Sequence, residues 1–119
     1  MRAVDWILRG ESVAIFAAGV WLALLVSPSP WLLVPLLLVP DISMVGYLAG
    51  PRLGAITYNL AHNLVLPILT VAVGWLTVNA LVALAGAILL AHVGMDRALG
   101  YGLKLPTDFK DTHLGRIGR

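Results

Sequence analysis

Residues 78–99 read VNALVALAGAILLAHVGMDRAL, an apolar run that ends in several ionisable side chains. At a rise of about 1.5 Å per residue, a helix of this length spans about 33 Å, which is enough to cross the hydrocarbon core of a bilayer. His92, Asp96 and Arg97 lie in its last two turns. Lipid disfavours such side chains, so their position raises the question of what they contact.

The composition of the whole chain is that of an integral membrane protein. Of its 119 residues, 60% are hydrophobic and 12% are charged, whereas an average soluble domain has about 25% charged residues. A chain of this length accommodates one domain of about four spans at roughly 20 residues each. The absence of cysteine excludes disulfides, thiolate metal sites and cysteine nucleophiles. A net charge of +2 is too small to indicate nucleic-acid binding.

Four apolar segments predict an all-α, four-helix membrane bundle that forms a single domain over residues 1–119. The expected spans are residues 8–27, 31–49, 53–76 and 78–99, followed by a tail at residues 100–119. Proline removes a backbone hydrogen bond, so we expect kinks at Pro35, Pro40 and Pro67. A signal peptide is the alternative for the N-terminus, but Glu11 before the apolar core and the lack of a small-residue cleavage site disfavour it.

The basic residues indicate how the spans are oriented. Lysine and arginine occur near the N-terminus, at Arg52 and from Arg97 onward, whereas the links at residues 27–30 and 74–79 carry no charge. Under the positive-inside rule, this bias predicts a protein of the cell's inner (cytoplasmic) membrane with both termini and the Arg52 loop in the cytoplasm. Trp31 and Trp75 then lie at the outer interface, where aromatic residues concentrate.

Ionisable residues from three spans reach a similar depth in this topology. Counting about 1.5 Å per residue from Arg52 places Asp41 roughly 16 Å and His62 roughly 15 Å from that end. His92 and Asp96 approach the same level as an i, i+4 pair on one helix face. Each ionised side chain dispersed in lipid would cost at least ~2.5 kcal/mol, so we expect the four residues to converge.

The chemistry of this set suits a metal, because two carboxylates and two imidazoles are good ligands for a divalent ion such as zinc, manganese or iron. The predicted metal ligands are Asp41, His62, His92 and Asp96. Neighbouring polar side chains would hydrogen-bond the imidazoles and fix their tautomers. The residues expected in that supporting role are Tyr58, Asn59 and Asn63.

An alternative is that the polar side chains only join helices, as they often do in small bundles. Asp41 would then pair with Arg97, and His62 with an asparagine or a backbone carbonyl. Convergence of four ionisable residues at one depth favours a functional site instead. Arg97 follows Asp96 directly, so it is turned about 100° around the helix, toward an interface that its long side chain can reach.

The C-terminal segment is polar and too short to fold alone, so disorder is one expectation for it. Its density of specific side chains instead favours packing of residues 103–119 on the cytoplasmic mouth of the bundle. The expected catalytic acid–base groups are Asp96, Asp111 and His113. The groups expected to bind a substrate phosphate or an anionic lipid headgroup are Arg97, Lys104 and Arg116.

Several long strings make the chain similar to a small bacterial membrane family known as domain of unknown function 4260. These strings are PDISMVGYLAGPRLGA, YNLAHN, LAHVGMDRALGYGLK and FKDTHLGRIG. The resemblance covers nearly the whole chain and implies a four-span protein without an established activity. More distantly, residues 91–106 resemble the His-x-x-x-Asp, Gly and Pro pattern of the membrane-bound metal-dependent hydrolases under LexA control. That resemblance implies that His92 and Asp96 are metal ligands, completed by Asp41 and His62.

From these observations we predict a metal-dependent hydrolase that acts on a lipid or another membrane-borne substrate, with the metal activating water. One alternative is a proton- or ion-conducting transport bundle in which Asp41, His62 and Asp96 titrate in sequence. Another is a non-catalytic structural or accessory subunit. Glycine-lined helix faces also predict a homodimer or larger homo-oligomer, with membrane lipids as the other partners.

Overall fold

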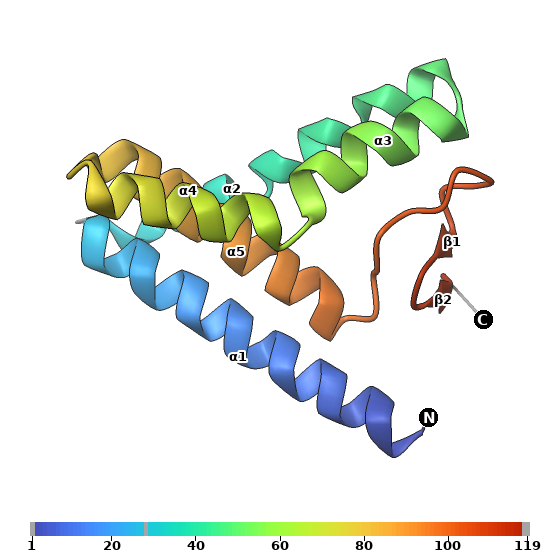
Figure 1. Cartoon of the computed structure of the whole chain (residues 1–119), viewed down its shortest axis with the longest axis horizontal. Coiled ribbons are helices and arrows are strands. Elements are labelled where there is room, and N and C mark those ends of the chain that lie inside the picture. The colour runs from blue at the N-terminus through green and yellow to red at the C-terminus, as the bar shows by residue number, and fades with distance from the viewer. Residues whose placement is uncertain (1, 28, 118–119) are drawn as a thin grey trace.

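The computed structural model describes residues 2–27 and 29–117, and these residues form a helical bundle with a short C-terminal hairpin. Figure 1 shows the start of α1 and the hairpin at the same end of the bundle. The elements in chain order are α1 (Ala3–Val26), the 3₁₀ helix η1 (Pro30–Leu32), α2 (Leu33–Leu36), the 3₁₀ helix η2 (Val39–Ala49), α3 (Pro51–His62), α4 (Val65–Leu76), α5 (Ala80–Ala98), β1 (Asp111–Thr112) and β2 (Gly115–Arg116).

Four helical stretches are long and apolar enough to cross a membrane, which confirms the expected membrane bundle. Three of them fall close to the expected spans, and these are Pro30–Ala49, Pro51–Leu76 and Ala80–Ala98. The first stretch, Ala3–Val26, begins earlier than the predicted residue 8. Asp5 extends this helix toward the N-terminus, because its carboxylate accepts a hydrogen bond from the backbone N–H of Arg2 at 2.9 Å.

The helix α5 is the centre of the bundle, because its small side chains let two neighbours approach closely. In the most apolar part of α5, 44% of the residues are buried. The corresponding share is 17% in each of the other three membrane-spanning stretches. On one side it packs against α1, where a Cβ added at Gly94 would lie 2.5 Å from the backbone nitrogen of Phe16. On the other side Gly86 packs on α4 near Val71. Such close helix contacts are how small residues stabilise bundles in lipid.

The second membrane-spanning stretch is mainly a 3₁₀ helix, and one of its prolines leaves a backbone carbonyl without its usual hydrogen-bond donor. The backbone N–H of Asp41 donates to the carbonyl of Leu38 at 3.1 Å, which is the i to i−3 pattern of a 3₁₀ helix. In that pattern the carbonyl of Leu37 would accept from residue 40. Residue 40 is proline and has no N–H, so the Leu37 carbonyl is left free for another donor.

The third stretch is broken into α3 and α4 at Asn63 and Leu64, four and three residues before Pro67. The ring of a proline clashes with the carbonyl four residues earlier, which here belongs to Asn63. The side chain of Asn63 closes the break, since its amide oxygen accepts from the backbone N–H of Leu66 at 2.8 Å. The kink expected at Pro67 is therefore present, and it places His62 at the last position of α3.

The helices η2 and α3 form a tight hairpin that turns at Gly50. This residue has a φ of 112°, a backbone conformation that other residues rarely adopt. Beyond the turn, Gly54 packs directly on the ring of Tyr47. The hydroxyl of Thr57 donates to the backbone carbonyl of Ser43 at 2.7 Å, which fixes how α3 lies along η2.

The segment after α5 folds back onto the bundle, as Figure 1 shows for the red part of the chain. Asn59 of α3 binds both backbone groups of Lys104, donating to its carbonyl at 2.8 Å and accepting from its N–H at 2.7 Å. Farther on, the ring of Phe109 packs edge-on against Tyr47, with centroids 5.1 Å apart. The expected packing of the tail thus holds for residues 103–117, while residues 118 and 119 lie outside the described residues.

Candidate metal centre

Four potential metal ligands come together from three membrane-spanning stretches, as the sequence predicts. They are Asp41 of η2, His62 at the end of α3, and His92 and Asp96 of α5. One potential ligand atom from each residue lies within 4.8 Å of the corresponding atom of every other residue. The expected convergence of these four side chains is therefore confirmed.

Five of the distances between these potential ligand atoms are compatible with a single ion. The two Nε2 atoms of His62 and His92 are 3.0 Å apart. The Oδ1 atom of Asp41 lies 3.3 Å from Nε2 of His62 and 3.0 Å from Nε2 of His92. The Oδ2 atom of Asp96 lies 3.5 Å and 3.3 Å from the same two atoms. Ligands at about 2.0–2.1 Å from a tetrahedral ion are separated by about 3.3 Å, which matches these values.

Backbone carbonyls fix the tautomer of both imidazoles. The Nδ1 atom of His62 lies 2.8 Å from the carbonyl oxygen of Tyr58, and Nδ1 of His92 is hydrogen-bonded to the carbonyl of Leu37. Because a carbonyl can only accept, each Nδ1 must carry the hydrogen. The Nε2 atom of each neutral ring then presents a lone pair to the centre of the cluster. Orientation of this kind is typical of metal-bound histidines.

When both rings are neutral, the centre of the cluster contains only hydrogen-bond acceptors. Two imidazole lone pairs and two carboxylate oxygens face one another, and such groups repel unless a cation lies among them. Burial makes this repulsion costly, since His62 is 2%, His92 0% and Asp96 9% exposed. A divalent ion would balance the two carboxylates, so the four residues fit a metal in charge as well as in distance.

Tyr58 supports the cluster through a carboxylate, whereas the sequence predicts a hydrogen bond from its side chain to an imidazole. Its hydroxyl donates to Oδ2 of Asp96 at 3.1 Å, and its ring stacks on His62 with centroids 3.7 Å apart. Asn59 and Asn63 were also expected to bind the imidazoles, but their side chains bind other groups. Asn59 binds the backbone of Lys104, and the side-chain nitrogen of Asn63 donates to the carbonyls of Asn59 and Leu60. Backbone carbonyls take the place expected for the two amides.

The Leu37 carbonyl is a functional group that the sequence interpretation missed. A signal for it exists in the sequence, since Pro40 lies three residues later and lacks the N–H that would bind this carbonyl in a 3₁₀ helix. That signal has meaning only if the segment is a 3₁₀ helix. In an α-helix the donor to the same carbonyl would be the N–H of Asp41, which is present.

Arg97 lies closer to the cluster than its expected interfacial position. Its Nη2 donates to the backbone carbonyl of His62 at 3.3 Å. That carbonyl is available because the N–H of Leu66, its usual partner in a continuous helix, binds the side chain of Asn63. Within the described residues, the ion pairs of Asp41 and Asp96 are with the two histidines, so the rival pairing of Asp41 with Arg97 is absent.

Three tail residues expected to act in catalysis or substrate binding instead stabilise the hairpin. Asp111 accepts from the hydroxyl of Thr107 at 2.6 Å and from Nη1 of Arg116 at 2.5 Å, and these two hydrogen bonds lower the pKa of its carboxyl. His113 accepts from the backbone N–H of Leu103 at 2.8 Å. Burial lowers the pKa of this imidazole, which keeps it neutral and able to accept. These contacts show a structural role for Asp111 and His113, and the catalytic roles expected of them stay predictions.

A cavity of about 250 Å³ lies directly against the two carboxylates of the cluster. Its lining residues come from η2, α3, α5 and the tail, and they are Asp41, Met44, Tyr58, Asp96, Tyr101, Lys104, Phe109 and Ile117. Asp41 is the ligand with the most exposed side chain, at 36%. A molecule in this cavity can therefore reach the cluster from the side that Asp41 and Asp96 form.

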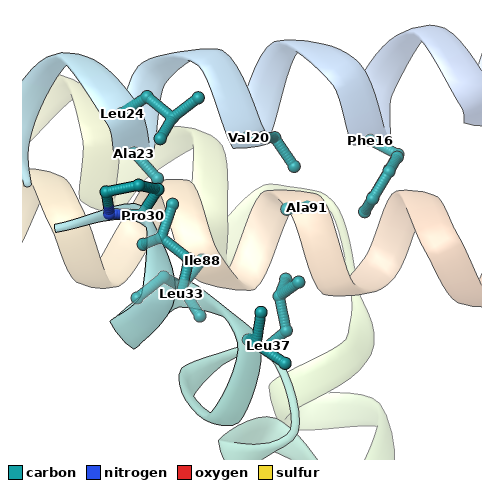
Figure 2. Close-up of a pocket in the computed structure, with 10 residues that line it drawn as sticks. Phe16, Val20, Ala23, Leu24, Pro30, Leu33, Leu37, Ile88 and Ala91 are labelled. Atoms are coloured by element: carbon teal, nitrogen blue, oxygen red, sulfur yellow. The ribbon is translucent and has the colours of Figure 1, made fainter.

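A second cavity of about 270 Å³ is lined by apolar residues of α1, η1, α2 and α5. Figure 2 shows Phe16 and Val20 of α1 on one side and Leu33 and Leu37 on the other. The lining residue Leu37 also supplies the carbonyl that binds His92. This apolar cavity and the Asp/His cluster therefore share part of one wall.

Of the comparisons with known proteins, the one with protein families found a match. Neither a search of curated proteins nor a search of solved structures found a match to the chain. The family described as domain of unknown function (DUF4260) matches residues 5–117, which include every residue of the cluster and both strands of the hairpin. The chain therefore belongs to the DUF4260 family.

Proposed function

We propose that this protein binds one divalent metal ion within the membrane and uses it to hydrolyse a lipid or another membrane-borne substrate. The observation that carries the proposal is the convergence of four acceptor atoms within 4.8 Å. Nδ1 of His62 and Nδ1 of His92 each donate their hydrogen to a backbone carbonyl. Zinc, manganese and iron all suit a set of two imidazoles and two carboxylates.

The residues around the cluster supply the other requirements of hydrolysis. A divalent ion held by these residues would supply an activated water as the nucleophile near neutral pH. Asp41 borders the cavity, where its second carboxylate oxygen can accept a proton from the attacking water. Tyr58 holds Asp96 in place through its hydroxyl, so the two carboxylates have different roles. The apolar helices around the site restrict the entry of bulk water.

We also propose the orientation and the partners that the sequence predicts. Clustering of basic residues at one end of the bundle supports cytoplasmic termini in the bacterial inner membrane. Large apolar side chains cover the outside, among them Trp21 at 64% and Leu48 at 89% exposed, and these suit lipid or a second copy of the chain.

Reporter fusions after Ile117 and at Thr77 should report opposite sides of the membrane. A measured protein mass in lipid nanodiscs equal to that of one chain would contradict the expected homodimer.

Elemental analysis of the purified full-length chain tests the proposed metal centre. We expect about one zinc, manganese or iron ion per chain in the wild type. Asp41→Asn should weaken metal affinity at least about 10-fold, because even indirect changes around a metal ligand have effects of 10- to 100-fold. Asp111→Asn is the matched control, since this carboxylate binds Thr107 and Arg116 outside the cluster.

The measured metal content separates the alternatives. Stoichiometric metal in the wild type and in Asp111→Asn, with loss in Asp41→Asn, supports the hydrolase. A well-folded wild-type chain that binds none of these metals, even when they are supplied in excess, would overturn it. The polar cluster would then be explained by a proton pathway or by helix assembly.

A further inference from the structure

The cavity beside the cluster is lined by a lysine whose ammonium group contacts two aromatic rings and faces the two carboxylates of the cluster. Lys104 is 4% exposed and lines this cavity together with Asp41 and Asp96. Its ammonium lies 3.8 Å from the ring centroid of Phe109 and 4.9 Å from that of Tyr58. Among the described residues, Nζ has these two aromatic contacts but no hydrogen bond or ion pair. Nζ is not among the fully buried side-chain atoms that lack a partner, so it is accessible from the cavity and can bind an anion there.

The backbone of Lys104 is held in place independently of its side chain. Asn59 binds both its N–H and its carbonyl, and an isolated β-bridge joins it to Thr112 of the hairpin. These contacts fix where the ammonium can reach. The side chain is thus positioned before any ligand binds, and positioning of this kind reduces the entropic cost of binding.

We propose that the cavity binds a phosphodiester group between the metal centre and Lys104, and that this group is hydrolysed. The proposal rests on the proposed function, because a divalent ion must balance Asp41 and Asp96. Once these two charges are balanced, the ammonium of Lys104 leaves one net positive charge around the cavity. A phosphodiester carries a single negative charge and matches it.

The bond that breaks also distinguishes a phosphodiester from other substrates. A carboxylic ester is neutral and would leave Lys104 without a partner, whereas a phosphomonoester carries up to two charges at neutral pH. In a phosphodiester, the phosphate group carries the negative charge that binds Lys104, and its phosphorus is also the atom that water attacks. The cavity of about 250 Å³ is smaller than most ligand pockets, so it suits a headgroup and leaves any acyl chain outside.

The reaction balances with water as the only co-reactant. The water oxygen forms a bond to phosphorus while one phosphorus–oxygen ester bond breaks. The departing oxygen takes a proton and leaves as an alcohol, and the other product is a phosphomonoester. Lys104 binds a non-bridging phosphate oxygen, on which negative charge increases in the transition state.

Lys104→Met tests this proposal in the full-length, metal-loaded protein in nanodiscs. The variant keeps an unbranched apolar stem against Phe109 and removes only the charge. We expect it to raise KM for bis(4-nitrophenyl) phosphate about 10- to 100-fold, the effect typical of losing a hydrogen bond to a charged group. Binding of dibutyl phosphate, measured by calorimetry, should weaken by a similar factor. Lys104→Arg should recover part of the loss, while Lys110→Met, which replaces an exposed tail lysine, should behave as wild type.

The substrates and the metal content make each outcome decisive. Unchanged metal content in Lys104→Met, together with weaker diester binding, supports the proposal. Faster hydrolysis of phosphatidylglycerol in vesicles than of the soluble diester identifies a lipid headgroup as the source of the phosphodiester, and the reverse identifies a soluble one. Hydrolysis of 4-nitrophenyl butyrate but not of either diester would overturn the phosphodiester and leave the metal hydrolase standing. A metal-free wild type would overturn both.

Discussion

Removing the metal from the full-length protein with a chelator is expected to lower its free energy of unfolding by about 3–4 kcal/mol. Binding to the folded state alone contributes about 2.7 kcal/mol at a metal concentration 100 times Kd and about 4.1 kcal/mol at 1,000 times Kd. Without the ion, Nε2 of His62 and Nε2 of His92 face each other at 3.0 Å as two lone pairs. The measurement is chemical unfolding of the protein in mild detergent, before and after chelation and after metal is restored.

Two variants make this first prediction specific. His92→Ala removes a ligand and leaves the cluster incomplete, so the stability of this variant should no longer respond to the chelator. Asp111→Asn lies outside the cluster and should show the same decrease as wild type. The response to chelation is compared within each variant, so a lower starting stability of His92→Ala does not affect the conclusion. Equal stability of the wild type with and without metal would contradict the metal centre.

Ending the chain after Gly102 is expected to reduce hydrolysis at least about 100-fold while the metal remains bound. The loss follows because the deleted segment contains Lys104, Phe109 and Ile117, which line the cavity beside the cluster. Misplaced substrate alone can cost a factor of this size. All four metal ligands precede residue 102, so elemental analysis should still find the ion. The measurement is the hydrolysis rate of bis(4-nitrophenyl) phosphate per bound metal.

A second truncation serves as the control for the tail. A chain that ends at Ile117 keeps every tail residue that contacts the cavity, and it should retain wild-type activity. Asn59→Ala gives an independent test, since it removes both hydrogen bonds to the backbone of Lys104 without shortening the chain. Full activity of the protein that ends at Gly102 would show that the tail has no part in the site.

The spans and the ligand set were predictable from the sequence because both depend on local spacing and on the cost of polar groups in lipid. His92 and Asp96 are four residues apart, so any α-helix places them on one face. Asp41 and His62 reach the same depth because each lies a similar number of residues from the turn at Gly50. Lipid penalises all four side chains if they are dispersed, which leaves convergence as the favourable arrangement.

The tertiary structure decided which groups complete the site, because those contacts join residues distant in the chain. Asn59 was expected to support an imidazole, but it lies on the side of α3 that meets the tail, and there it binds Lys104. The tautomer of His92 depends on the Leu37 carbonyl, which is free because Pro40 has no N–H and the N–H of Asp41 binds the carbonyl of Leu38 instead. The sequence by itself determined the four-span bundle and the four side chains that could hold a metal. Their hydrogen-bond partners, and the cavity beside them, depended on how the helices and the tail pack, which no local spacing specifies.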